Sequence, residues 1–154
     1  MSKTTSHTIN WRLKKFDDLT PHELYALLQL RSEVFVVEQQ CLFQDMDGKD
    51  VCSLHLLGWA GDKLAASTRI VPAGVSYIYP SIGRVVTSPA FRGIGLGRQL
   101  MEESIREAEN LYGKQPIRIG AQLYLKSFYQ SLGFEQSGDL YLEDGIEHIE
   151  MTRS

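Results

Sequence analysis

Three glycines at alternate positions, placed where a strand gives way to a helix, constrain this chain more than any other feature of its sequence. Gly93, Gly95 and Gly97 follow an apolar run that ends at Thr87, and they precede a segment with helical periodicity. The first N–H groups of a helix have no partner inside the helix and lie at the positive end of its dipole. Because glycines let a ligand come close to that backbone, the pattern predicts a helix start that binds phosphate oxygens.

Charged residues beside the glycines agree with a phosphate ligand. Arg92 precedes the first glycine, and Arg98 stands in the first helical turn, where acidic residues are usual. Two guanidinium groups suit a diphosphate. The segment matches neither a Walker A loop nor the Gly-x-Gly-x-x-Gly pattern of dinucleotide-binding folds. A glycine-rich helix start without a ligand is the alternative, and the strand, the helix and the two arginines together disfavour it.

The composition limits the class of protein and of partner. The chain has 154 residues, 43% hydrophobic and 23% charged, which indicates one globular domain over residues 1–154. A formal net charge of −3 gives no general attraction to nucleic acid or to an anionic membrane, so a small-molecule partner is expected. The chain shows neither a signal peptide nor a membrane span, which favours a cytoplasmic protein. Cys41 and Cys52 should be free thiols, and Cys52 with His55 lacks the further ligands of a zinc site, so no metal is predicted.

Hydrophobic periodicity and turn residues predict the order strand, helix, three strands, helix, strand, helix and two strands. Thr20 and Glu23 form a capping-box pattern that begins the first helix, which should end near Glu38. Gly61-Asp62 and Asp144-Gly145 are tight-turn pairs between strands. We expect strands at 8–16, 53–60, 64–71, 77–87, 117–121, 140–142 and 146–151, and helices from the glycines to Gly113 and at 123–132. This order describes a mixed α/β sheet covered by helices.

Two segments resemble a known protein family. Arg92-Gly93-Ile94-Gly95-Leu96-Gly97 is similar to the Arg/Gln-x-x-Gly-x-Gly/Ala pyrophosphate motif of the GCN5-related N-acetyltransferases (GNAT family). The segment 128–134 resembles the second recurrent signature of that family, and the element order matches its fold from Ile9 to Met151. Residues 30–39, followed by an acidic loop and His55-Leu56, are similar to the ElaA-like branch of the family. That branch does not settle the acceptor.

The resemblance implies a fold and a set of binding residues. It implies a mixed, mostly antiparallel sheet flanked by helices, whose central parallel strands, 82–87 and 117–121, splay apart around the pantetheine arm of coenzyme A. Acetyl-CoA is the implied co-substrate, and the family also suggests a homodimer. The backbone contacts to the arm and thioester would come from Val85, Val86 and Thr87. With the charge pattern, the pyrophosphate contacts would come from Arg92, Gly93, Ile94, Gly95, Leu96, Gly97 and Arg98.

Two side chains are candidates for proton transfer. Tyr129 shares its helix with Leu125 and Leu132 at core-like spacing, but its place in the family signature favours an acid that protonates the departing thiolate. Glu38 ends the first helix, where the dipole disfavours a carboxylate, so its pKa should be raised and suit a base for the amine. A solvated surface acid is the alternative for Glu38.

An acidic loop follows the first helix. Asp45, Asp47 and Asp50 do not match a calcium loop, because Gly48 comes too early. The loop is either solvated or forms a rim that attracts a cationic amine. His55 should be hydrogen-bonded within the sheet or line the acceptor side.

The sequence therefore predicts an enzyme that transfers an acetyl group from acetyl-CoA to a small-molecule or peptide amine. The amine would attack the thioester directly, with no covalent enzyme intermediate. The alternative is a non-catalytic acyl-CoA-binding or interaction domain that has kept the pyrophosphate loop.

Overall fold

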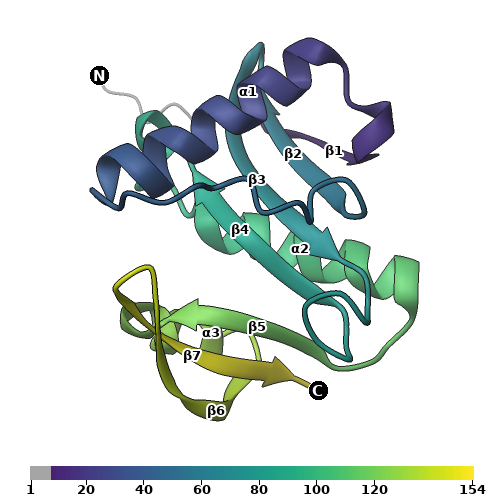
Figure 1. Cartoon of the computed structure of the whole chain (residues 1–154). Helices are drawn as coiled ribbons and strands as arrows, with labels where there is room; N and C mark the ends of the chain where they lie inside the picture. The colour runs from purple at the N-terminus through teal and green to yellow at the C-terminus, as the bar shows by residue number, and fades with distance from the viewer. Residues whose placement is uncertain (1–7) are drawn as a thin grey trace.

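A seven-stranded sheet with the strand order β1-β2-β3-β4-β5-β7-β6 forms the centre of the computed structural model, which describes residues 8–154. The fold is the mixed, mostly antiparallel α/β sheet that the sequence predicted (Figure 1). Its strands are β1 (Asn10–Lys15), β2 (Leu54–Ala60), β3 (Lys63–Val71), β4 (Ser81–Thr87), β5 (Ile117–Gln122), β6 (Phe134–Glu143) and β7 (Ile146–Arg153). Its α-helices are α1 (Pro21–Arg31), α2 (Leu96–Tyr112) and α3 (Lys126–Gln130), and a π-helix, η2 (Ser32–Glu38), continues α1.

The start of α1 confirms the predicted capping box. The Thr20 side chain accepts a hydrogen bond from the Glu23 N–H at 3.1 Å, and the Glu23 carboxylate accepts one from the Thr20 N–H at 2.9 Å. The helical run ends at Glu38 as predicted, but its last seven residues are π-helical. There the Gln39 N–H donates to the Val34 carbonyl, five residues earlier. Such wide turns are rare and often mark functional sites.

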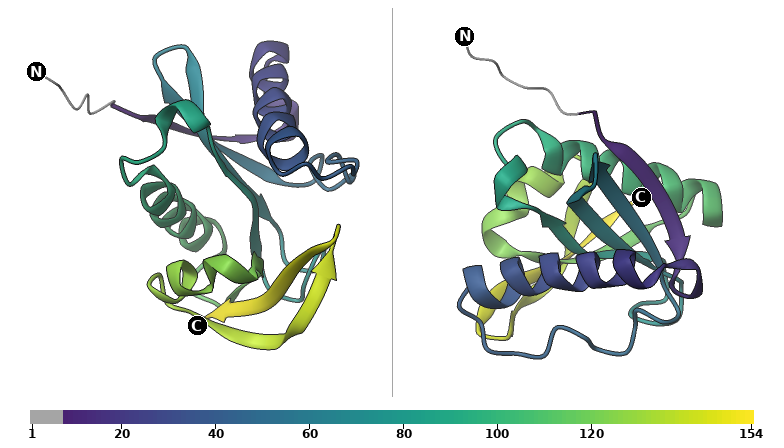
Figure 2. Two further views of the ribbon diagram at one scale, coloured as in Figure 1. Left: turned by 90° about the vertical axis from the view of Figure 1, so that its left-hand side faces the viewer. Right: turned by 90° about the horizontal axis from the view of Figure 1, so that it is seen from above.

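Alternating side chains of the central strands bury both faces of the sheet. Leu57 of β2 packs on the α1 side with Leu27 and Leu30, whereas its neighbour Leu56 packs on the α2 side with Leu100. Successive side chains of a strand point to opposite faces, so one strand supplies two cores. Figure 2 shows α1 and α2 on opposite sides of the sheet.

The tight turns and the final hairpin follow the sequence prediction. β6 and β7 pair antiparallel, and Asp144 and Gly145 connect them with φ angles of 51° and 79°. Positive φ at both central residues is the geometry of a type I′ hairpin turn. β6 is longer than predicted, since it begins at Phe134, directly after Gly133 ends the α3 segment with a φ of 96°.

Besides β6 and shifts of one or two residues at other ends, two further predicted elements differ from the structure. β4 begins at Ser81 rather than at residue 77, because Pro80 precedes it and has no N–H to donate to a neighbouring strand. The helix predicted at 123–132 is divided into a 3-10 turn (Leu123–Leu125) and the short α3.

The parallel strands β4 and β5 separate soon after they meet. Their pairing is limited to Ser81 opposite Arg118, beyond which the two strands diverge (Figure 1). This is the splayed central pair that the family resemblance implied. The opening between the two strands holds the candidate site.

Candidate functional site

A cavity of about 660 Å³ lies where β4 and β5 diverge. Its wall combines segments that are far apart in the sequence: the π-helix η2, the end of β4, the glycine-rich turn, α3 and the β6–β7 hairpin. The sequence-predicted site residues that line it are Glu38, Val85, Val86, Thr87, Arg92, Gly97 and Tyr129. The structure thus joins the predicted phosphate-binding turn to both predicted proton-transfer residues.

The glycine-rich turn presents open backbone at the start of α2. Gly93 and Gly95 have φ angles of 86° and 77°, a region that side-chain-bearing residues rarely adopt. Gly95 is the N-cap of α2; it supplies no capping side chain, and no acidic residue stands in the first turn. A Cβ at Gly93, Gly95 or Gly97 would meet nothing within 4 Å among the described residues. This combination suits the approach of an anionic group to the N–H groups.

The other members of the predicted pyrophosphate set have different surroundings. The Leu96 side chain is buried in the core beneath α2, so only its backbone can reach a ligand. Ile94 is largely exposed. Arg98 binds the end of the α3 segment, where its Nη1 donates to Ser131 Oγ at 2.9 Å. Arg98 therefore connects two helices, and its contact with a diphosphate stays a prediction.

Strand β4 contains an irregularity beside the cavity. Ser67 of β3 lies opposite Val86 and Arg69 lies opposite Gly83, so Arg84 and Val85 together oppose a single residue. Arg84 has a φ of 47°, which is unusual for a residue with a side chain. A bulge of this kind turns the strand's backbone and redirects its side chains, and such bulges are common next to active sites.

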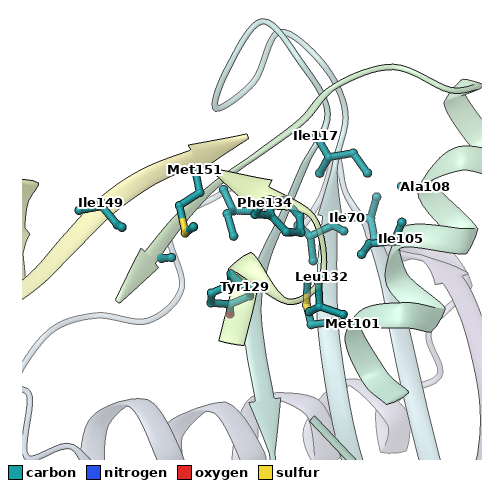
Figure 3. Packing of buried hydrophobic residues seen from close by; sticks show 13 residues of the cluster. Ile70, Met101, Ile105, Ala108, Ile117, Tyr129, Leu132, Phe134, Ile149 and Met151 are labelled. Carbon is teal, nitrogen blue, oxygen red and sulfur yellow. The ribbon is translucent and has the colours of Figure 1, made fainter. Parts of the chain in front are cut away.

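Tyr129 lies at the boundary between the core and the cavity. Its ring packs edge-on against Phe128 and Phe134, with centroid separations of 5.1 and 6.0 Å, at the edge of the cluster shown in Figure 3. Burial raises the pKa of Tyr129 to about 12, because the phenolate would lose hydration. The hydroxyl is therefore protonated at any pH near neutrality, as a proton donor must be.

Glu38 differs from its sequence-based prediction. Hydrogen bonds from Arg92 to both carboxylate oxygens, at 2.6 and 2.8 Å, lower the pKa of Glu38 below its usual value. The predicted rise in pKa is wrong, since a bidentate guanidinium contact outweighs the helix dipole. The same pair occupies Arg92, the residue predicted to bind the diphosphate. The role of Glu38 as a base stays a prediction.

The acidic loop is only partly solvated, and its carboxylates are paired with arginines. Asp45 and Asp50 are buried, and three arginines from separate elements neutralise the three aspartates. Arg31 of α1 binds Asp45 and Asp50 at 2.8 Å, Arg69 of β3 binds Asp47 and Asp50, and Arg84 of β4 binds Asp45. Both interpretations were wrong for Asp45 and Asp50, because the arginines that bind them come from elsewhere in the sequence, while Asp47 is paired but stays exposed.

A second, smaller cavity of about 370 Å³ adjoins the first and shares Phe43, Gly83, Gly120 and Glu143 with it. Its wall includes Tyr77 and Tyr141. The two cavities together extend the site beyond the predicted coenzyme side towards the β6–β7 hairpin. No motif in the sequence pointed to this side.

The hairpin residues on this side share one face of the sheet. Tyr141 pairs with His148, and Glu143 pairs with Ile146, so the period-two alternation places all four side chains together. Glu143, Ile146 and His148 line the larger cavity. The alternation was visible in the sequence, but nothing there indicated which face would border the cavity.

Of the remaining predicted residues, Cys41 lines the larger cavity, whereas His55 and Cys52 do not. His55 donates from Nε2 to the Asp50 carbonyl of the acidic loop at 2.9 Å, so its partner lies outside the sheet, and His55 lines neither cavity. Cys41 and Cys52 are free thiols as predicted. Among residues 8–154, no group of three His, Cys, Asp or Glu side chains is placed to hold a metal ion. No helix in that part of the chain is long and apolar enough to cross a membrane.

Comparison with known proteins gives consistent matches over nearly the whole chain. The acetyltransferase (GNAT) domain model matches residues 17–154. The Escherichia coli protein ElaA is 44% identical over 147 residues, which cover 94% of this chain and 96% of ElaA. The crystal structure of an acyl-CoA N-acyltransferase from Pseudomonas aeruginosa has a TM-score of 0.92 and 45% identity, covering 96% of this chain and 100% of that one. An aminoglycoside 6′-N-acetyltransferase complexed with coenzyme A, at 16% identity and a TM-score of 0.68, shares the fold over 92% of this chain and 96% of its own.

Proposed function

This chain belongs to the GNAT acetyltransferase family, and from that premise we propose that it transfers the acetyl group of acetyl-CoA to the nitrogen of a small-molecule or peptide amine. One observation carries the proposal: a single cavity connects the open glycine-rich start of α2 with the buried hydroxyl-bearing ring of Tyr129. A coenzyme whose diphosphate binds at the glycine-rich end would thus place its thioester near the proton donor at the other end.

The diphosphate of coenzyme A would bind at the glycine-rich turn. The unpaired N–H groups at the α2 N-terminus supply donors, and the positive φ angles of Gly93 and Gly95 leave the backbone uncovered. Arg92, which is paired with Glu38, would supply a cation by exchanging that carboxylate for the diphosphate. Binding of the diphosphate therefore exchanges one anionic partner of Arg92 for another.

The pantetheine arm would run into the opening between β4 and β5. There Val85, Val86 and Thr87 line the cavity, and their backbone does not pair with β5. Backbone groups held in a fixed strand can orient the thioester carbonyl without reorganisation during the reaction. Tyr129 would protonate the sulfur as the C–S bond breaks.

The test is a panel of amines incubated with acetyl-CoA, with free thiol as the readout. The panel should include primary alkylamines, amino acids, aminoglycosides and peptides with a free N-terminus or lysine. We expect at least one amine to raise thiol release well above the rate with water alone, and mass spectrometry should find the acetylated amine. Coenzyme A binding without amine-dependent thiol release would favour the non-catalytic acyl-CoA-binding alternative.

A further inference from the structure

The β6–β7 hairpin brings an imidazole to the edge of the cavity. His148 of β7 lines the cavity and is only 7% exposed, so its surroundings are fixed by the protein rather than by solvent. Glu143 of β6 lines the same wall. Neither side chain belongs to the predicted coenzyme-binding set, which lies on the β4 and α2 side.

Hydrogen bonding fixes the protonation pattern of this imidazole. The Nδ1 atom of His148 lies 2.7 Å from the carbonyl oxygen of Ile146. A carbonyl can only accept, so Nδ1 carries the hydrogen and, in the neutral ring, Nε2 carries the lone pair. Nε2 in turn lies 4.0 Å from the Glu143 carboxylate.

Aromatic side chains hold the ring in place. Tyr141 stacks on His148 with a centroid separation of 5.6 Å and an interplanar angle of 29°. The Tyr141 hydroxyl is hydrogen-bonded to Tyr77 from the β3–β4 loop. This bond passes over Gly120 of β5, where an added Cβ would overlap the Tyr141 hydroxyl. Tyr141 and the Ile146 carbonyl therefore restrict the orientation of the His148 ring, and Tyr77 holds Tyr141 in turn, as the supporting groups of functional sites commonly do.

We propose that His148 is the base that removes a proton from the acceptor amine, an inference that rests on the proposed function. Nε2 of His148 accepts one proton from the ammonium form of the acceptor. The freed nitrogen lone pair forms the N–C bond to the thioester carbonyl carbon, and the C–S bond then breaks with its electron pair on sulfur. Tyr129 gives its proton to that sulfur and regains one from the nitrogen through solvent. The products are an amide, a thiol and the proton that His148 releases to water.

Other titratable groups border the cavity, and their chemistry makes them weaker candidates. Glu38 is bound by Arg92, whose hydrogen bonds lower its pKa and reduce its basicity. Tyr129 has a pKa of about 12 because it is buried, so it holds its proton near neutral pH. The charged or titratable groups that share this cavity with His148 include Glu38, Cys41, Arg84, Tyr124, Tyr129 and Glu143.

The variant that tests the proposal is His148→Asn. The Asn amide can still donate a hydrogen bond to the Ile146 carbonyl, but it has no basic nitrogen. At neutral pH we expect kcat/KM for a primary alkylamine to fall about 10²-fold or more, the scale of one positioned general base. The deficit should shrink as the pH approaches about 10, where an alkylamine loses its proton without help. Coenzyme A affinity should stay within about twofold of the parent. His22→Asn, an exposed position on α1, is the matched control and should change none of these values.

A second variant separates proton transfer from packing. Glu143→Gln removes the carboxylate near Nε2 but leaves the basic nitrogen, so kcat/KM at neutral pH should fall much less than in His148→Asn. A folded His148→Asn variant with parental kcat/KM at neutral pH would overturn the assignment while leaving acetyl transfer intact. A parent protein that binds coenzyme A yet acetylates no alkylamine would overturn both the assignment and the proposed function.

Discussion

Tyr129 can act as a core aromatic ring or as a proton donor, and only the second role requires its hydroxyl group. Its ring packs in the core, and within the described chain no hydrogen bond holds its hydroxyl. Tyr129→Phe should therefore keep the fold and leave coenzyme A affinity nearly unchanged. If the hydroxyl protonates the leaving thiolate, turnover at saturating acetyl-CoA should fall roughly 10²-fold. Steady-state kinetics with thiol detection measures this.

The control for that experiment is Tyr112→Phe. Tyr112 packs against the same core cluster from the end of α2, and burial likewise raises its pKa, but it does not line the cavity. Loss of its hydroxyl should leave turnover unchanged. Turnover of Tyr129→Phe within about twofold of the parent would assign the leaving-group proton to water or to another residue.

The ion pair between Glu38 and Arg92 can also be tested by substitution. If the diphosphate must displace Glu38 from Arg92, Glu38→Gln should strengthen coenzyme A binding. The pair is roughly 40% exposed on each side, so solvent screening limits the gain to about 2- to 5-fold at low salt. Isothermal titration calorimetry of coenzyme A at two ionic strengths measures it. Weaker binding in the variant would mean that Glu38 positions Arg92 for the ligand instead of competing with it.

The contrast between Tyr129 and His148 shows what the sequence could predict at the scale of residues. Tyr129 follows a recognisable signature, so the sequence alone was enough to predict its place in the site. His148 stands in an ordinary alternating strand, and its importance depends on the Ile146 carbonyl, on Tyr141 and on the cavity wall. The raised pKa predicted for Glu38 failed for the same reason, because its partner Arg92 lies 54 positions away.

Among the elements, the start of α2 depends most directly on glycine. Gly95 has a φ of 77°, where a β-branched residue is strained by about 1–2 kcal/mol, yet an added Cβ would meet nothing within 4 Å among the described residues. Gly95→Val should thus fold but lose most of its coenzyme A affinity, by about tenfold or more, because the side chain covers the N–H groups and strains the turn. Calorimetry on the folded variant tests this.

Gly61→Val provides the matched control for the helix start. Gly61, in the β2–β3 turn, also has a positive φ, of 63°, and open space around it, but it does not line the cavity. The backbone strain should be similar, while coenzyme A affinity should not change. Equal affinity in Gly95→Val and the parent would remove the glycine-rich turn from the binding site.

Capping and turn residues, which act over a few positions, predicted the helices and strands well. Irregular features of those elements depend on contacts between residues far apart in the sequence. Thr20, Glu23 and the Asp144-Gly145 turn act within a few residues, so the sequence alone placed the first helix and the last hairpin. The bulge at Arg84 depends on distant partners, since its guanidinium binds Asp45 at 2.8 Å. The π-helical end of α1 carried no local signal in the sequence that we could identify.

In the whole molecule, the arginine–aspartate network adds buried ion pairs between α1 and the sheet, which also pack together through apolar side chains. Arg31 belongs to α1, Arg69 and Arg84 belong to the sheet, and the aspartates belong to the loop that crosses between them. Burial alone would raise the pKa of Asp50, but hydrogen bonds and charges from Arg31 and Arg69 outweigh it, so the net pKa is lowered. The pKa of Asp47 is lowered by the same balance, against Arg69 and Arg84. The network also positions β4, because Arg84 lies in the bulge beside the site.

These lowered pKa values predict how stability depends on pH. A carboxylate whose folded pKa lies below its unfolded value, about 3.9 for Asp, stabilises the fold fully above that value and loses this contribution as the pH falls through the folded pKa. Burial lowers the pKa of His55 as well, so an earlier, smaller loss should begin below about pH 6.5, where the unfolded imidazole gains a proton first. Thermal unfolding should therefore give a melting temperature that declines gently below about pH 6.5 and steeply below about pH 4.

The variant Asp50→Asn tests the contribution of the network. It should lower the free energy of unfolding by about 3–5 kcal/mol, the scale of breaking a buried ion pair, and make the decline of the melting temperature below about pH 4 less steep. Asp139→Asn, on the exposed surface of β6, should keep the parental curve. A melting temperature that is constant down to about pH 2 would contradict a stabilising role for the network, because its carboxylates would then bind protons equally in the folded and unfolded chain.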